Sequence, residues 1–492
     1  MSTTVVSSDE NRRILEQAGV VDLLSRVSSA VRVTSAGVEV ENEDRLRSEA
    51  IDRLVRAAVF AADDERDTAR WLIGEAGRLL GIRPASIHEL YLARGRGEAS
   101  GFTVPAMNVR AAAFDTGRAL FAAARELEVG AMICEIARSE IGYTDQRPAE
   151  YVACMTAAAI KEGWSGPLFV QGDHFQVSAK KYAADPGSEV QAVRELIREA
   201  VHAGFYNIDV DTSTLVELSH RSLDAQQERN YRLSAGLTEF IRALEPDGVT
   251  VSVGGEIGEV GSENSTPEEL RSYMAGYLRE MKSRSGRAGR ELKGLSKISV
   301  QSGTSHGGVV LADGSVAEVA IDFETLGTLA KIARDEYGLA GAVQHGASTL
   351  PPEAFGKFPQ VETAEIHLAT NFQNIFFQHE SFPASLRERI YNHLRSAHAD
   401  ERKEGDSEEQ FLYKTRKKAL GVFKRELWEM EDEGRAAIRE SLSEQFAFLF
   451  RRLAVDGTRG LVGRHVEPPD LPRSGPAALR IESARDDWDL SD

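Results

Sequence analysis

The pattern of hydrophobic and polar positions divides the chain into four stretches. From residue 1 to about 85, apolar residues recur at helical spacing among charges. From about residue 86, short apolar runs alternate with amphipathic stretches, and after about residue 400 the chain is again helical and highly charged. The pattern predicts a helical N-terminal extension over 1–85, an α/β domain over 86–399, and a helical extension over 400–464 that packs on this domain or on a second subunit. The tail over 465–492 is rich in Pro, Arg and Asp, and we expect it to be disordered.

Eight apolar runs of strand length occupy the middle stretch. They are GFTVPAMN (101–108), GAMICEIA (130–137), PLFVQGD (167–173), YNIDVD (206–211), VTVSVGGEIG (249–258), KISVQSG (297–303), GAVQHG (341–346) and AEIHLAT (364–370). The helical stretches between them include 112–128, 189–204, 230–245 and 322–337. This alternation predicts a (β/α)₈ TIM barrel, which takes roughly 250 residues, although other parallel α/β arrangements would give a similar pattern.

Charge and cysteine content narrow the class of protein. The 492 residues carry a formal net charge of −18, with 77 acidic against 59 basic residues. An acidic chain repels nucleic acid and anionic lipid, so we expect neither nucleic acid nor a membrane as a partner. Two cysteines, Cys134 and Cys154, do not make a disulfide framework. The first residues lack the pattern of a signal peptide, and no apolar run approaches the ~20 residues of a membrane span, so we expect a cytoplasmic protein.

Polar residues that end the apolar runs mark the candidate site. They are Asp173 and His174 after the third run, Asp209 and Asp211 in the fourth, Glu256 in the fifth, His306 after the sixth, His345 in the seventh and Asn371 after the eighth. Active sites of TIM barrels lie at the C-terminal ends of the strands, so these side chains should converge. Three imidazoles can hold Zn²⁺ and leave one position open, and Glu256 could be an added or alternative ligand. A lone histidine at a strand end is more often a plain polar residue of the rim.

Small residues near the same strand ends suggest an anion site. Gly307 and Gly308 follow His306, while Gly346 and Ser348 follow His345. Such residues let backbone N–H groups approach a phosphate, and the hydroxyls of Ser348 and Thr370 add donors. For any single loop, ordinary turn glycines are the competing interpretation.

These residues resemble the class II fructose-1,6-bisphosphate / tagatose-1,6-bisphosphate aldolase family from about Ile87 to about Asn374. The motifs that carry the resemblance are HELYLARGRGEASGFTVPAMNV, GDH at 172–174, GFYNIDVDTS, VSVGGEIGEVG, SHGGVVL, QHGAS and IHLATNFQ. No single motif is unique to the family, but together they occur in the family's order and include its expected metal ligands.

The resemblance implies a role for each matching residue. His174, His306 and His345 match the zinc ligands, and Glu256 matches a glutamate that contacts the metal in an alternative position. Asp173 matches the catalytic aspartate, and Glu263, or else Glu259, is the candidate for the base on a mobile loop. The residues implied to bind substrate are Asn108, Asp211, Gly307, Gly346, Ser348, Ala369, Thr370 and Asn371.

The implied reaction is reversible aldol cleavage of a ketose phosphate, such as fructose-1,6-bisphosphate, to dihydroxyacetone phosphate and an aldehyde. In the family, zinc holds the donor's oxygens and stabilises an enediolate, so no Schiff-base lysine is needed. The resemblance implies one Zn²⁺ per chain, allows a monovalent cation, and makes a homo-oligomer, dimer or tetramer, the expected assembly. The same ligands could also hold Co²⁺ or Fe²⁺.

Departures from the family pattern cluster around the substrate. No lysine follows His306, Ala347 and Thr349 replace glycines, His367 replaces an asparagine, Asn371 an aspartate, Ala137 a serine and Gly254 an acid. Arg138, if it points inward, could pair with a phosphate or carboxylate. Retained metal ligands with altered substrate contacts favour aldol chemistry on a different substrate. A catalytically weak homologue with a structural or regulatory role, and a hydrolase that uses zinc-bound water, are the alternatives.

Overall fold

The computed structural model describes residues 8–258, 263–303, 321–477 and 479. The chain forms two compact units. One comprises residues 1–83, 149–166 and 470–492, and the other comprises residues 84–148 and 167–469. Half of the tail that we expect to be disordered, residues 478 and 480–492, lies outside the described residues.

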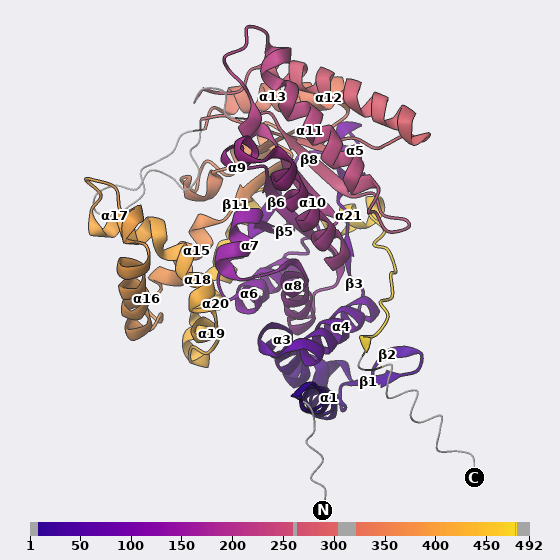
Figure 1. Ribbon diagram of the computed structural model, residues 1–492, viewed down its shortest axis with the longest axis vertical. Helices are drawn as coiled ribbons and strands as arrows, with labels where there is room; N and C mark the ends of the chain where they lie inside the picture. The colour runs from indigo at the N-terminus through magenta and orange to yellow at the C-terminus, as the bar shows by residue number, and fades with distance from the viewer. Residues whose placement is uncertain (1–7, 259–262, 304–320, 478, 480–492) are drawn as a thin grey trace, which may run out of the picture. The chain divides into compact units, whose positions relative to one another are not determined.

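The larger unit is built on a closed barrel of parallel strands (Figure 1). Among the described residues the barrel strands are β4 (Val104–Asn108), β5 (Ile133–Ala137), β6 (Gly166–Gln176), β7 (Asn207–Asp211), β8 (Ser252–Glu256), β9 (Lys297–Val300), β10 (Ala342–Gln344) and β11 (Glu365–Leu368). Each strand pairs with the next in chain order, and β11 pairs with β4 to close the ring. The predicted TIM barrel is therefore confirmed, and each of the eight apolar runs contains one strand.

Helices follow the strands and cover the barrel. Those of the larger unit are α5 (His88–Gly95), α6 (Ala113–Glu126), α7 (Arg138–Thr144), α9 (Ala179–Ala184), α10 (Pro186–Ala203), α11 (Leu223–Arg242), α12 (Pro267–Ala288), α13 (Phe323–Tyr337), α14 (Lys357–Gln360) and α15 (Thr370–Gln378). The four helical stretches named from the sequence all overlap these helices. α12 is not among the stretches named from the sequence; Thr266 and Glu269 form a capping box at its start, and Pro267 occupies its first position.

The C-terminal helical stretch belongs to the same unit as the barrel. It follows α16 (Ala384–Ala397) and contains α17 (Glu408–Thr415), the 3₁₀ turn η5 (Arg416–Lys418), α18 (Ala419–Val422), α19 (Lys424–Trp428), α20 (Asp432–Arg452) and α21 (Arg459–His465). The apolar face of α20 packs on α6. Arg435 and Arg439 of α20 reach Asp115 of α6 at 2.9 and 2.7 Å. The sequence predicts that the extension packs on the barrel domain or on a second subunit, and in the structure α20 packs on the barrel domain.

The smaller unit is largely helical but contains a hairpin that the periodicity did not predict. Its elements are α1 (Ser8–Val27), β1 (Val31–Thr34), β2 (Gly37–Val40), α2 (Glu43–Arg45), the π-turn η1 (Leu46–Ala50), α3 (Ile51–Phe60), α4 (Asp63–Leu79), part of β3 (Ile82–Ala85) and most of α8 (Pro148–Glu162). β1 and β2 pair antiparallel around a two-residue turn that ends at Gly37, whose φ is +125°. Alternation over only four residues per strand is too short to stand out against the helical periodicity around it.

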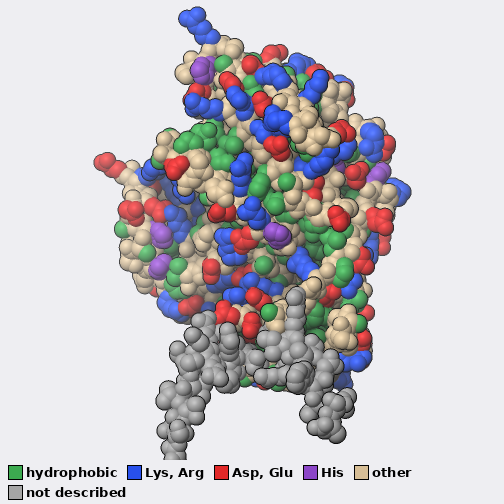
Figure 2. All heavy atoms as spheres, turned by 45° about the vertical axis from the view of Figure 1, so that its right-hand side comes forward, with side chains coloured by type: hydrophobic (Ala, Val, Ile, Leu, Met, Phe, Trp, Pro, Cys, Tyr) green, Lys and Arg blue, Asp and Glu red, His purple; other side chains and the backbone are tan. Residues whose placement is uncertain are grey.

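Charged side chains of both signs cover the surface. Figure 2 shows acidic and basic groups interspersed over the face that it draws. No helix within the described part of the chain has both the length and the apolar character needed to cross a membrane.

We expect His88 to make the fold sensitive to acid. Its ring, at the start of α5, is 3% exposed, and burial together with the charges of Arg242 and Lys293 lowers its pKa to about 3. His88 therefore stays neutral in the folded state but is protonated in the unfolded state below about pH 6.5. The free energy of unfolding falls as the pH falls through that value. Between pH 7.5 and 5 the loss is about 2 kcal/mol.

The test compares free energies of unfolding by urea at both pH values for the wild-type chain and His88→Gln. The pH-dependent loss should shrink by about 2 kcal/mol in the variant. The control is His202→Gln, which replaces an exposed histidine on α10 and should keep the wild-type loss. An equal loss in the wild type and in His88→Gln would contradict the prediction.

Candidate metal and substrate site

A bulge in β6 brings two consecutive site residues to the barrel interior. Neighbouring residues of a regular strand point to opposite faces. Here the pairing of β6 with β7 shifts between Gly172 and Phe175, and His174 has a φ of +40°. Asp173 and His174 consequently both contact interior groups. A residue of this type with positive φ is strained, and such strain persists where the surrounding structure holds it in place.

His174 lies at the centre of a cluster of metal-ligand type. Its Nε2 atom is 3.0 Å from Nδ1 of His345. Its Nδ1 atom is 3.2 Å from an Asp211 oxygen and 3.3 Å from a Glu256 oxygen. On the far side of the second ring, Nε2 of His345 is 3.1 Å from the Ser299 hydroxyl. Asp211, Glu256 and His345, from β7, β8 and the end of β10, therefore bring potential metal-ligand atoms to His174 at the C-terminal end of the barrel.

The field at this cluster is strongly negative. Although burial lowers the pKa of His174, the charges of Asp173 and Glu256 raise it well above its usual value. Burial and the charge of Asp211 raise the pKa of Glu256 to about 7. Burial also raises the pKa of Asp211, but hydrogen bonds from His174 and Ser213 outweigh it and keep that carboxylate ionised. The cluster therefore favours a positive charge at its centre.

The described residues fit a divalent cation. Two nitrogen ligands at 2.0–2.1 Å from a tetrahedral zinc lie about 3.3 Å apart, close to the separation of the two imidazole nitrogens. Asp173, His174 and His345 form one group of close ligand atoms, and His174, Asp211 and Glu256 form another. Such a cation would offset the negative field that otherwise raises the pKa of His174. His306, the third predicted histidine ligand, lies outside the described residues, and so does Gly307.

A second polar layer lies closer to the N-terminal ends of the strands, on β5, β6, β7, β9 and β11. Its members are Glu135, Gln171, Asp209, Lys297 and Glu365. The Lys297 ammonium donates to Gln171 at 2.8 Å, to Asp209 at 3.0 Å and to Glu365 at 2.5 Å. Although burial lowers the pKa of Lys297, the two carboxylates raise it above its ordinary value, so this lysine is held as a cation. It is thus unsuited to act as a Schiff-base nucleophile.

His367 joins the two layers. Its Nδ1 atom lies 3.0 Å from Glu135 and 3.1 Å from Asp173, and its Nε2 atom lies 2.8 Å from Glu365. Although burial lowers the pKa of His367, the charges of Glu135 and Asp173 raise it well above its usual value. Burial and the charge of Asp173 raise the pKa of Glu135 to about 8. The residue that departs from the family's asparagine is therefore a buried imidazolium beside Asp173.

Gly254, another departure, leaves room for the second layer. A Cβ atom at this position would lie 2.2 Å from an Asp209 oxygen and 2.9 Å from a Lys297 carbon. An acid side chain here is incompatible with the ion pair between these two residues. The glycine and the buried lysine therefore belong to one arrangement.

The residues expected to bind substrate surround the same end of the barrel. Asn108 is 2% exposed, and its amide donates to Glu140 at 2.5 Å and accepts from Arg110 at 3.1 Å. The Ser348 hydroxyl accepts from the backbone N–H groups of Ala369 and Thr370 at 2.7 and 3.3 Å. Gly346, with a φ of +72°, permits the turn that presents this serine. The two N–H groups at the start of α15 thus lie together with Ser348 as their acceptor, and a phosphate bound here would take the place of the hydroxyl.

Three other candidate residues are placed less favourably. Asn371 is half-buried on α15. Glu263 is exposed, and Glu259 lies outside the described residues. Arg138 does not reach the substrate region, because its guanidinium pairs with Glu189 at 2.5 Å and donates to the Gln176 carbonyl at 2.6 Å.

Sequence reasoning did not single out Gln171, Lys297, Glu365, Arg110 or Glu140. For the first three, the available signal was a polar residue inside an apolar run, two positions before a strand-end residue. Arg110 and Glu140 gave no comparable signal, since charges are ordinary in the loops and helices that follow strands.

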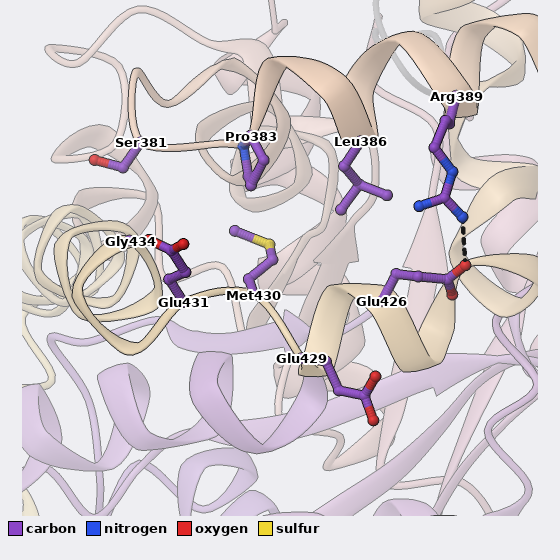
Figure 3. Close-up of a pocket in the computed structure, with 9 residues that line it drawn as sticks. All are labelled: Ser381, Pro383, Leu386, Arg389, Glu426, Glu429, Met430, Glu431 and Gly434. Carbon is purple, nitrogen blue, oxygen red and sulfur yellow. Dashed lines mark hydrogen bonds and ion pairs between the residues drawn. The ribbon is translucent and has the colours of Figure 1, made fainter.

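A cavity of about 540 Å³ lies elsewhere in the larger unit (Figure 3). Pro383, Leu386 and Met430 line it together with a charged rim on which Arg389 pairs with Glu426 at 2.8 Å. Glu429 and Glu431 add negative charge to this rim. An anionic sugar would be repelled here, and no member of the histidine cluster lines the cavity.

Comparison with known families adds an independent finding. The family model described as "Fructose-bisphosphate aldolase class-II" matches residues 95–434. Searching the curated proteins gives no match.

Several solved structures share the fold at low sequence identity. The YdjI aldolase from Escherichia coli K12 is 15% identical, with 76% of this chain and 99% of that chain covered and a TM-score of 0.44. A fructose-bisphosphate aldolase from Campylobacter jejuni is 16% identical, with 77% and 98% covered and a TM-score of 0.45. The fructuronate-tagaturonate epimerase UxaE from Cohnella laeviribosi is 12% identical, with 87% and 90% covered and a TM-score of 0.54.

Proposed function

Because this chain belongs to the class II fructose-bisphosphate aldolase family, we propose that it is a metal-dependent aldolase that acts on a phosphorylated ketose. The reaction is reversible cleavage to dihydroxyacetone phosphate and an aldehyde. One observation carries the proposal: Asp173 shares the C-terminal end of the barrel with His174, His345 and Glu256. Zn²⁺ is the proposed metal, with His306 as a further ligand.

The bound metal supplies Lewis acidity at the ketone and hydroxyl oxygens of the donor. In cleavage, Asp173 takes the proton of the hydroxyl on the carbon that becomes the aldehyde. The electron pair of the breaking C–C bond then moves toward the ketone. In the reverse direction Asp173 returns the proton to the aldehyde oxygen. His367, 3.1 Å from Asp173, holds this carboxylate by charge and orientation.

The phosphate of the donor is proposed to bind at the start of α15. There the N–H groups of Ala369 and Thr370 lie together on the Ser348 hydroxyl, which a phosphate would replace as their acceptor, and the positive φ of Gly346 permits the turn that carries this serine. Asn108 and Asp211 support the site from β4 and β7. Asn371 and Gly307, the latter outside the described residues, complete the proposed set. Glu263 is proposed as the group that protonates the donor carbon after cleavage and removes that proton in the reverse direction.

A specific observation favours a second candidate function, epimerisation of a keto sugar acid. The epimerase structure covers 87% of this chain, which is more than the barrel alone, at a TM-score above 0.5. Cleaving a C–C bond and reforming it on the other face of the aldehyde inverts one hydroxyl-bearing carbon. The two fragments are not released, and the product is the epimer. The same acid–base group could serve both reactions.

The experiment incubates the purified full chain with fructose-1,6-bisphosphate and, separately, with tagaturonate, each with and without chelator. A coupled assay follows triose phosphate, and NMR follows the sugar. Chelator-sensitive release of triose phosphate is expected for the aldolase. Chelator-sensitive conversion of tagaturonate to its epimer without cleavage would replace the first proposal by the second. Neither reaction, with one metal bound per chain, would overturn both and leave the catalytically weak homologue.

A further inference from the structure

The C-terminal extension reaches the end of the barrel that carries the candidate site. Residues of η5 and α18 contact α7, the helix that follows β5 (Figure 1). The backbones approach closely, since a Cβ atom at Gly421 would lie 2.7 Å from the Tyr143 carbonyl oxygen. The Lys424 ammonium donates to the Asp145 carbonyl at the end of α7. This segment is therefore anchored to the rim of the barrel.

Arg110 and Glu140 form an ion pair under this contact. Glu140 is 5% exposed and accepts from the backbone N–H of Ala137 at 2.8 Å as well as from Asn108. Arg110 pairs with the other Glu140 oxygen, and its charge also acts on Asp173. The single carboxylate is thus already held by three donors on the rim next to Asp173.

Lys417 adds a second positive charge to this place. Its ammonium lies 5.8 Å from the centre of the Tyr143 ring, and burial together with the charge of Arg110 lowers its pKa. The neighbouring lysines have acidic partners, since Lys418 pairs with Glu401 and Lys414 pairs with Asp406. Among the described residues, no carboxylate lies within ion-pair distance of Lys417. Two cations therefore lie near Glu140 at the rim, and only Arg110 pairs with it.

We propose that Arg110 and Lys417 form an anion-binding site for a phosphate or carboxylate group of the substrate, beside Asp173. The inference rests on the proposed function only in assigning the anion to a substrate. A lysine offers a point charge and an arginine a planar fork, and both suit these two groups. The segment after His306 lacks the family's lysine. In the proposed site, Lys417 supplies a positive charge from a distant part of the chain.

The test measures binding of two probes, inorganic phosphate and glycerate, to the metal-loaded full chain by calorimetry. Lys417→Met keeps the length of the side chain and its contact with the ring but removes the charge. It should bind at least one probe roughly tenfold to hundredfold more weakly than the wild type. Lys417→Arg should stay within a few-fold of the wild type. The matched control is Lys414→Met, an exposed lysine of α17 that should bind both probes as the wild type does.

The outcomes separate the sources of the anion. Weakening for phosphate alone indicates a sugar phosphate, weakening for glycerate alone indicates a sugar acid, and weakening for both indicates a site that reads charge only. Unchanged affinity of Lys417→Met for both probes would overturn the site. Because no turnover is measured, the binding test does not depend on the proposed function. The chain could lack aldolase activity and still bind the probes through Lys417.

Discussion

Replacing Asp173 by asparagine should lower kcat by about 10²–10⁴-fold, the usual contribution of a positioned general acid–base group. The amide keeps the shape of the side chain but cannot exchange a proton with the substrate oxygen. It also retains an oxygen that faces Nδ1 of His367, which is 3.1 Å away in the wild type. Steady-state cleavage assays measure the fall in kcat, and elemental analysis measures the metal content of the variant.

The metal content distinguishes a catalytic role from a structural one. Asp173→Asn should hold as much metal as the wild type, because His174 and His345 remain in place. The matched control is Asp335→Asn, which removes an exposed carboxylate on α13 that pairs only with Lys331 in the described structure. It should leave kcat unchanged. An Asp173→Asn enzyme with kcat within threefold of the wild type would rule out this acid–base role.

The alternation of inward residues explains why much of the site could be predicted from the sequence. Asp173, Asp211 and Glu256 each end an apolar run, and a strand end in a parallel barrel is where polar groups meet. The residue two positions earlier also faces inward, which gives Gln171, Asp209 and Gly254. The sequence thus indicated the upper layer by its place at the strand ends. Of the lower layer it indicated Asp209, but it concealed Gln171 and Glu365 inside runs that otherwise look apolar.

Two features of the site depend on geometry that a single strand does not encode. His174 follows Asp173 directly, so regular alternation would point it outward, and only the bulge between Gly172 and Phe175 turns it to the interior. The positive φ that this requires is unusual for histidine. Motif resemblance named His174 together with Asp173, but the residue pattern alone gave no reason for both side chains to face the same way.

The rim charges show a different limit of the sequence. Arg110, Glu140 and Lys417 come together although the third lies about 280 residues from the second. The charged C-terminal stretch predicted helices, and its apolar positions predicted packing, but neither pattern selects Lys417 from its basic neighbours. The difference appears only when the acidic partners of Lys414 and Lys418 are known.

Replacing His345 by glutamine should cost more than a hundredfold in metal affinity and remove chelator-sensitive activity with it. The ring lies 3.0 Å from the His174 nitrogen, so its loss leaves one described imidazole at the cluster. Ser299→Ala removes only the group 3.1 Å behind the His345 ring. Loss of such a supporting partner typically costs 10–100-fold in metal affinity, so this variant should fall between His345→Gln and the wild type.

This order of affinities is measured by competition with a chromogenic chelator. A metal that binds only the folded state also raises its stability in proportion to the logarithm of its concentration over the dissociation constant. The rise in melting temperature on adding Zn²⁺ should therefore follow the same order and vanish in His345→Gln. Equal metal affinity in the wild type and His345→Gln would place the cation at a group without His345. His174→Gln would then abolish binding if the ligands are His174, Asp211 and Glu256, whereas His367→Gln would abolish it if the cation lies at a group that includes His367.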